Sequence, residues 1–202
     1  MDFSVDVIKN DIINLSTKDF IIKYLLKSDN WYFSNYLGLE PTDAIKKMEG
    51  LKGLLNSKLE IAYHNVLMVG SGKIGCSLSP DKNFRQFNDD SDIDIAIISS
   101  KRFNDIWGKI RIASMEEHIS YNRIASSIFR GFINEKQFSN INFARQYWNE
   151  QITELNRCIQ EKIGIYHPVN YRIYRSWEDL EDYHMSGINK LKNILNYGYQ
   201  LQ

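Results

Sequence analysis

The chain has 202 residues, of which 43% are hydrophobic, so it is long enough and apolar enough to bury a sizeable core within one domain. Lysine plus arginine and aspartate plus glutamate both number 25, so the net charge indicates no polyanionic partner, and any nucleic-acid site has to be a local patch. No apolar run approaches the ~18 residues of a spanning helix, and the two cysteines, Cys76 and Cys158, accompany no recognisable secretion signal; we therefore expect no membrane insertion and a cytoplasmic setting.

Residues 1–63 show helical spacing of apolar side chains. The stretch VIKNDIINL has this spacing, and DFIIKYLLK repeats it after a candidate cap at Ser16. A further helix is expected to begin near Pro41 with Ile45, Met48, Leu51, Leu54 and Leu55 on one face. These stripes are interpreted as core, with a homodimer seam left open.

Residues 64–100 change character and carry the chemistry. The run NVLMVGSG predicts a strand that ends in a glycine turn, and CSLSPDKNFRQFNDD is typical of a polar loop. The next run, SDIDIAIIS, has the composition of a buried strand but contains Asp92 and Asp94. Because strand side chains alternate between faces, both aspartates are expected on one face, with Ile93 on the other.

Residues 101–202 are predicted to be helical up to about Ile163, with breaks near Gly131 and Asn140. HPVNYRIYRS follows as a third strand, and a last helix is expected to begin at Ser176, where Ser-Trp-Glu-Asp approximates a capping box. We therefore predict one domain over residues 1–202, in three parts: 1–63, 64–100 and 101–202. The expected fold class is mixed α/β, with a small mixed sheet flanked by helices and with helical elaboration at both ends.

Two carboxylates on one strand face repel each other unless a cation lies between them, and hard oxygen ligands favour Mg²⁺, Mn²⁺ or Ca²⁺. A solvated strand end is the simpler interpretation and stays open. Three other motifs fail. VGSGKIG lacks the first glycine and the final Ser or Thr of a P-loop. It also fails as a dinucleotide-binding fingerprint, because no clean strand–helix unit with a ribose-binding acid follows it. The aspartates do not form an EF-hand calcium loop, because Ile95 replaces the turn glycine.

The combination of a strand ending in Gly70-Ser71 with a later strand bearing Asp92-Ile93-Asp94 resembles the DNA polymerase beta-like nucleotidyltransferase superfamily. The resemblance implies a sheet of the nucleotidyltransferase type. It implies that Gly70 and Ser71 contact the phosphates of a nucleoside triphosphate, and that Asp92 and Asp94 are catalytic ligands of two Mg²⁺ (or Mn²⁺) ions. Lys73, beside the turn, is a candidate third phosphate contact.

The sequence departs from the family pattern in two places. The interval between Ser71 and Asp92 is long, and the third strand lacks the carboxylate that the family carries on a later strand: Asn170 and Arg172 share the face where it is expected. Glu178 and Asp179 lie in the first turn of the last helix, where the favourable interaction of acids with the helix dipole explains their presence. Glu116 and Glu117 are further candidates for completing the site.

The resemblance implies an ATP-binding or other nucleotide-binding transferase that moves a nucleoside monophosphate from an NTP or dNTP to a hydroxyl and releases pyrophosphate. The acceptor is a nucleic-acid end, a nucleotide, a small molecule or a protein hydroxyl. The hydroxyl of Tyr197 or Tyr199 in the same chain is one candidate for a protein acceptor. Small enzymes of this superfamily often resemble components of antiviral defence or toxin–antitoxin systems. By this analogy we expect the chain to bind an operon partner protein or a second copy of itself. The alternative is an inactive protein of the same fold that binds a nucleotide or a protein partner.

Overall fold

The computed structural model describes residues 3–116, 122–138 and 141–197. The chain divides into two compact units, and each combines distant parts of the sequence. Unit 1 consists of Met1–Met48, Met68–Asp94 and Glu181–Gln202, and unit 2 consists of Glu49–Leu67 and Ile95–Leu180. The single-domain organisation expected from the sequence stays a prediction.

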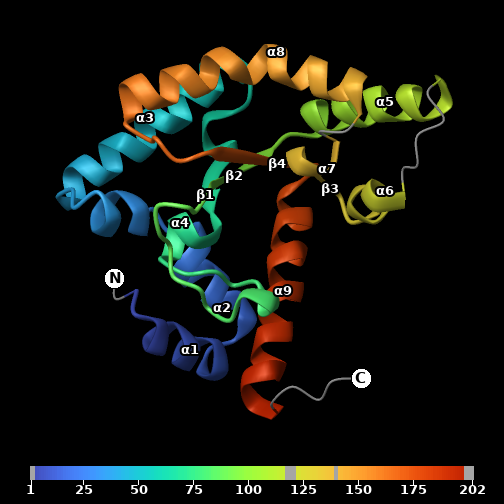
Figure 1. The fold of residues 1–202 in the computed structure, drawn as a ribbon. Helices are drawn as coiled ribbons and strands as arrows, with labels where there is room; N and C mark the ends of the chain where they lie inside the picture. The colour runs from blue at the N-terminus through green and yellow to red at the C-terminus, as the bar shows by residue number, and fades with distance from the viewer. Residues whose placement is uncertain (1–2, 117–121, 139–140, 198–202) are drawn as a thin grey trace. The chain divides into compact units, whose positions relative to one another are not determined.

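The fold is mixed α/β and mostly helical, as the sequence predicts (Figure 1). In the described part of the chain, four strands form one mixed sheet in the order β1-β2-β4-β3. The strands are β1 (Val66–Val69), β2 (Ile93–Ile98), β3 (Phe132–Asn134) and β4 (Val169–Tyr174). Strands β1, β2 and β4 lie where the sequence places them.

Strand β3 follows the break that the sequence predicts near Gly131, but the sequence analysis expected no strand there. It has only three residues, too few for an alternating pattern to be visible, and it forms through antiparallel pairing with β4, with Phe132 opposite Tyr174 and Asn134 opposite Arg172. Such pairing is non-local information that a sequence window does not contain.

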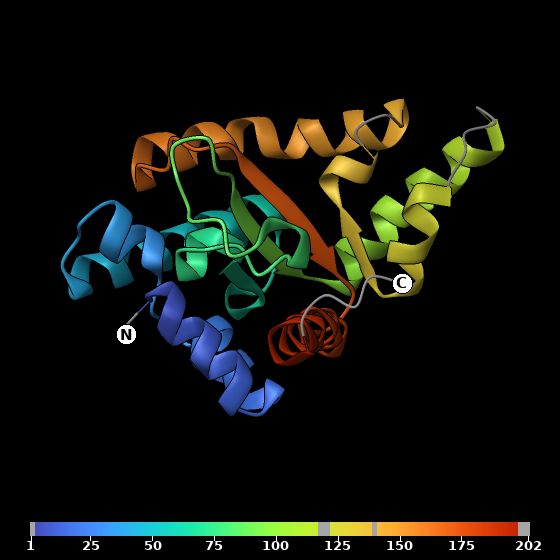
Figure 2. The same cartoon turned by 60° about the horizontal axis from the view of Figure 1, so that its bottom comes forward.

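Unit 1 contains short helices, two of which are π-helices. They are α1 (Val5–Asn14), α2 (Thr17–Ile21), η1 (Ile22–Leu26), η2 (Tyr32–Tyr36), α4 (Gly70–Ile74) and η4 (Pro80–Lys82). The cap predicted at Ser16 is confirmed, because its hydroxyl accepts a 3.1 Å hydrogen bond from the backbone N–H of Asp19. Figure 2 shows α1, in dark blue, lying beside α2, which it contacts.

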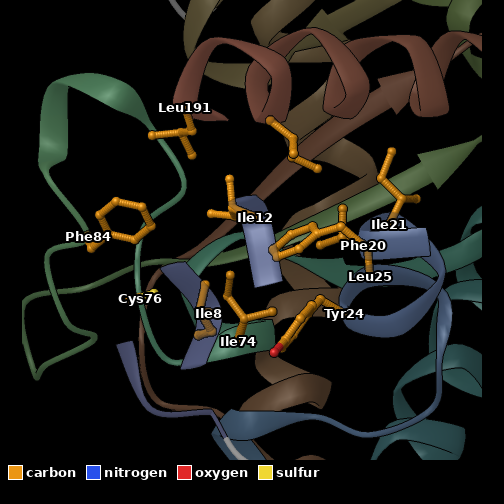
Figure 3. Close-up of a cluster of buried hydrophobic side chains, with 11 residues drawn as sticks. Ile8, Ile12, Phe20, Ile21, Tyr24, Leu25, Ile74, Cys76, Phe84 and Leu191 are labelled. Carbon is orange, nitrogen blue, oxygen red and sulfur yellow. The ribbon is translucent and has the colours of Figure 1, made fainter. Parts of the chain in front are cut away.

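The core of unit 1 joins the N-terminal helices to the loop after α4 (Figure 3). Ile8 and Ile12 of α1 pack in one cluster with Phe20, Tyr24, Ile74, Cys76, Phe84 and Leu191. At roughly 1.5–3 kcal/mol for each fully buried large apolar side chain, this cluster is a major source of stability for the unit. It also anchors the chain after the glycine turn, through Ile74, Cys76 and Phe84.

Unit 2 contains longer helices. They are η3 (Tyr63–Asn65), α5 (Ser100–Glu116), α6 (Asn122–Phe129), α7 (Glu135–Phe138), α8 (Asn142–Cys158) and η5 (Ile159–Ile163). Helix α5 packs against α8. The buried Trp148 ring meets Phe138 and Tyr171 edge to face, with centroids 6.4 and 5.6 Å away.

Two helices contribute to both units: α3 (Pro41–Leu59) and α9 (Trp177–Tyr197). Helix α3 begins at the predicted proline, and Met48, Leu51 and Leu55 are buried as expected, but Ile45 is exposed and Ala44 takes its place in the core. The cap expected at Ser176 is confirmed, since its hydroxyl accepts a 3.2 Å hydrogen bond from the N–H of Asp179. Within the described residues, no helix has the length and apolar character needed to cross a bilayer.

Candidate functional site

The proposed phosphate-binding turn lies directly at the end of β1. The strand ends at Val69, whose backbone is extended, and α4 begins at Gly70 without any intervening loop. At this junction Gly70 has φ +67°, a conformation that disfavours residues with a side chain. The arrangement strand–Gly–Ser–helix expected from the sequence is therefore present.

Gly70 contacts the second aspartate of the acidic strand. A Cβ built on Gly70 would lie 2.6 Å from Oδ2 of Asp94 and 3.4 Å from its Cβ. Any side chain at position 70 would therefore collide with the Asp94 carboxylate. The glycine turn and the acidic strand, 24 positions apart in sequence, meet at this point.

The two aspartates have the placement that strand alternation predicts. Asp92 immediately precedes β2 and Asp94 is its second residue; both are half-buried, whereas Ile93 and Ile95 are buried. Two residues along a strand span about 6.6 Å, so the two side chains leave the strand close enough to act on one ligand. Gly70, Ser71, Asp92 and Asp94 all belong to unit 1.

The other residues of the glycine turn pack against the same strand. A Cβ on Gly72 would lie 2.9 Å from Cδ1 of Ile93 and 3.8 Å from the Phe87 ring. The glycines of the motif thus allow α4 to approach β2 closely. This packing explains why the sequence resembles a P-loop or a dinucleotide fingerprint without satisfying either pattern.

The long interval between Ser71 and Asp92 folds back onto α4. An antiparallel bridge joins Cys76 to Gln86, and the N–H of Phe87 donates a 2.9 Å hydrogen bond to the carbonyl of Gly75. Phe84 and Phe87 are both buried, so their role in this structure is packing. Burial raises the pKa of the Cys76 thiol to about 11, which makes it an inert core residue.

Lys73 requires a correction, because the structure does not place it among the phosphate contacts. Its side chain is only 4% exposed, and Nζ donates hydrogen bonds to the backbone carbonyls of Lys27 and Asp29. Lys73 therefore fixes the segment between η1 and η2 onto α4. The sequence could not reveal this, because a lysine beside a glycine turn matches a phosphate ligand and a buried carbonyl-binding lysine equally well.

An aromatic cluster beside α4 was not anticipated from the sequence. Trp31, Tyr32 and Tyr36 surround Phe87, with ring centroids 5.3–5.6 Å from it. The hydroxyl of Tyr36 donates a 2.5 Å hydrogen bond to Asp89, which raises the tyrosine pKa. The aromatic density of the stretch WYFSNY was the available signal.

The expected third carboxylate is absent from β4, and Asn170 and Arg172, which occupy the relevant face, belong to unit 2. The guanidinium of Arg172 lies over the Phe132 ring, 5.8 Å from its centroid. Glu116 is exposed at the end of α5, and Glu117 lies outside the described residues, as does Tyr199.

The acids at the start of α9 make local contacts within the first turn of that helix. Asp179 accepts two hydrogen bonds from the Arg175 guanidinium, at 2.9 and 3.0 Å, and its backbone N–H donates to the capping hydroxyl of Ser176. A hydrogen bond from its own backbone lowers the pKa of Glu178, with a further contribution from Ser176.

The donor set fits a magnesium site that is completed by substrate. Asp92 and Asp94 offer hard carboxylate oxygens, and over residues 3–116, 122–138 and 141–197 no cluster of three or more His, Cys, Asp or Glu side chains could hold a metal. Mg²⁺ is commonly held by one or two carboxylates plus substrate phosphates and water, whereas zinc and calcium sites need more protein ligands. The arrangement therefore suits a metal that arrives with a phosphorylated ligand.

Comparisons of the chain with protein family models, with curated proteins and with solved structures found no match. The interpretation of the site therefore depends on its own residues and geometry.

Proposed function

We propose that the protein is a Mg²⁺- or Mn²⁺-dependent nucleotidyltransferase that moves a nucleoside monophosphate from a nucleoside triphosphate to a hydroxyl acceptor, with release of pyrophosphate. The observation that supports this most strongly is the contact between Gly70 and Asp94. It brings the first turn of a helix, where backbone N–H groups have no acceptor within the helix, against a paired-carboxylate strand, which is the arrangement needed to hold a triphosphate and its metal ions together.

Each residue has a defined part in this proposal. The backbone at Gly70 and Ser71 and the Ser71 hydroxyl donate hydrogen bonds to terminal phosphate oxygens. Asp92 and Asp94 hold the metal ions, which would neutralise phosphate charge and make the acceptor hydroxyl more acidic. Lys73 does not touch the nucleotide, but keeps α4 in position through the carbonyls of Lys27 and Asp29.

The test compares two double variants that remove the same charge. Purified protein is incubated with labelled ATP, GTP, CTP, UTP and dNTPs with Mg²⁺ or Mn²⁺, and products are resolved on gels and by mass spectrometry. Asp92→Asn with Asp94→Asn should abolish transfer, whereas Asp89→Asn with Asp90→Asn, at exposed positions just before the strand, should leave it intact. Equal activity in both double variants would refute the assignment.

A second candidate is a catalytically inactive protein of this type that binds a nucleotide or a protein partner. It is favoured by one observation: in the described part of the chain, no third acid joins Asp92 and Asp94 in a metal-binding cluster. Metal-dependent nucleotide binding by calorimetry, lost in the Asp92/Asp94 double variant and accompanied by no product, would favour this candidate over the transferase.

A further inference from the structure

Helix η2 of unit 1 has a contact with each half of the candidate nucleotide site. At its start, the Trp31 indole packs on the residue that ends α4: a Cβ built on Gly75 would lie 2.7 Å from Nε1 of Trp31. At its end, the hydroxyl of Tyr36 donates a 2.5 Å hydrogen bond to Asp89, three positions before Asp92. The helix therefore links the helix that follows the glycine turn to the segment that enters the acidic strand.

The Phe87 ring fills the space between these two contacts. Its centroid lies 5.6 Å from that of Trp31 and 5.3 Å from that of Tyr36. Its backbone N–H donates a 2.9 Å hydrogen bond to the carbonyl of Gly75, and its ring lies 3.8 Å from a Cβ built on Gly72. Trp31, Tyr36 and Phe87 thus form a continuous aromatic brace between α4 and the chain that leads to β2.

The chain between Asp89 and Asp92 is short and closed by hydrogen bonds. The N–H of Ser91 donates a 2.9 Å bond to the carbonyl of Asn88, and the N–H of Asn88 donates a 3.0 Å bond to the Ser91 hydroxyl. The Ser91 hydroxyl in turn donates to Oδ1 of Asn88 at 3.0 Å. A turn held in this way leaves little freedom between its residues, so a displacement of Asp89 is passed on to Asp92.

We infer that the aromatic brace fixes the distance between the glycine turn and the paired aspartates, with Tyr36 as its positioning residue. The inference rests on the proposed nucleotide site. A metal ion held by Asp92 and Asp94 also needs phosphate oxygens that the turn holds, so both halves have to stay within about 0.5 Å of the productive geometry. Tyr36 acts on this geometry through Asp89 and does not touch the nucleotide.

The test removes one hydroxyl and measures the metal requirement of nucleotide binding. Tyr36→Phe keeps the ring that contacts Tyr32 and Phe87. Calorimetric titrations with ATP, GTP, CTP or UTP at graded Mg²⁺ should show a half-maximal Mg²⁺ concentration about 3- to 10-fold above wild type, the range that one hydrogen bond can produce. Asp89→Ala should have the same effect, and the double variant should be no worse than either single variant. Asp89→Asn keeps an oxygen acceptor and should stay near wild type.

Tyr24→Phe is the matched control. The Tyr24 hydroxyl, drawn in Figure 3, also donates a 2.5 Å hydrogen bond to a carboxylate of unit 1, but this bond joins η1 to Asp11 of α1. Its loss should leave the Mg²⁺ requirement unchanged. A Tyr36→Phe protein with the Mg²⁺ requirement of wild type, or a Tyr24→Phe protein with the same change as Tyr36→Phe, overturns the inference.

Hydrogen exchange provides a measurement that needs no nucleotide. Mass spectrometry of peptides covering residues 70–75 and 88–94 should show exchange several-fold faster in Tyr36→Phe than in wild type in both segments, and unchanged exchange there in Tyr24→Phe. Unchanged exchange in Tyr36→Phe overturns the brace even if the protein binds nucleotide. A wild-type protein that neither binds nor transfers a nucleotide refutes the proposed function instead, so the two failures are distinguishable.

Discussion

Replacing Gly70 by alanine tests the central contact of the candidate site. Two effects act at this position. The left-handed backbone at φ +67° costs about 1–2 kcal/mol for an alanine. The new Cβ would also lie 2.6 Å from Oδ2 of Asp94, so the carboxylate has to rotate away, which adds about 0.5–1.5 kcal/mol. We expect a loss of about 1.5–3.5 kcal/mol in the free energy of unfolding.

Gly38→Ala is the matched control. Gly38 has a similar positive φ, +63°, but nothing lies within 4 Å of its built Cβ. It should therefore lose only the backbone term of about 1–2 kcal/mol. In an Asp94→Ala background, the cost of Gly70→Ala should fall to that of Gly38→Ala, because the collision is removed.

The functional readout separates the two glycine variants more strongly. Displacement of a metal ligand by about 1 Å is expected to lower transfer about 100-fold in Gly70→Ala, while Gly38→Ala stays near wild type. Urea denaturation gives the stability values, and labelled-nucleotide transfer or metal-dependent nucleotide binding gives the functional ones. Equal stability and equal nucleotide handling in the two variants would refute the reasoning.

Three further predictions concern charged side chains that are buried or partly buried. Lys73→Met should lower the free energy of unfolding by about 1–3 kcal/mol, because the backbone carbonyls of Lys27 and Asp29 lose a charged donor; unchanged stability with lost nucleotide binding would return Lys73 to the phosphate contacts. Burial raises the pKa of Glu135, so the folded protein holds this proton more tightly than the unfolded chain does, and the resulting stabilisation is lost as pH rises above about 4.5. The melting temperature of Glu135→Gln should therefore increase relative to wild type from pH 4 upwards. A difference in melting temperature that does not change with pH would contradict this. Burial opposes ionisation of Asp11, but hydrogen bonds from Lys23 and Tyr24 outweigh this effect and lower the pKa of Asp11. The stabilisation by ionised Asp11 is therefore present above about pH 3.8 and lost as pH falls. Asp11→Asn should lower the melting temperature at pH 7 but have little effect near pH 2.

Local signals determined most of the elements that carry the site. Alternation predicted that Asp92 and Asp94 share a face, and a strand followed at once by Gly70-Ser71 predicted the turn that the structure contains. Capping was visible at Ser16 and Ser176, because a side-chain hydroxyl and the N–H three residues later are within one helical turn. All of these are short-range relations, which a single sequence expresses directly.

The tertiary structure decided what depends on partners distant in the sequence. Only the fold shows that the Lys73 ammonium is bound by the carbonyls at positions 27 and 29, that β3 forms against β4, and that Phe84 and Phe87 are buried. The contact of Gly70 with Asp94 is of the same kind. The sequence specified which groups were available, and packing decided which of them meet, because the free energy of each contact depends on burial and neighbours that no local pattern contains.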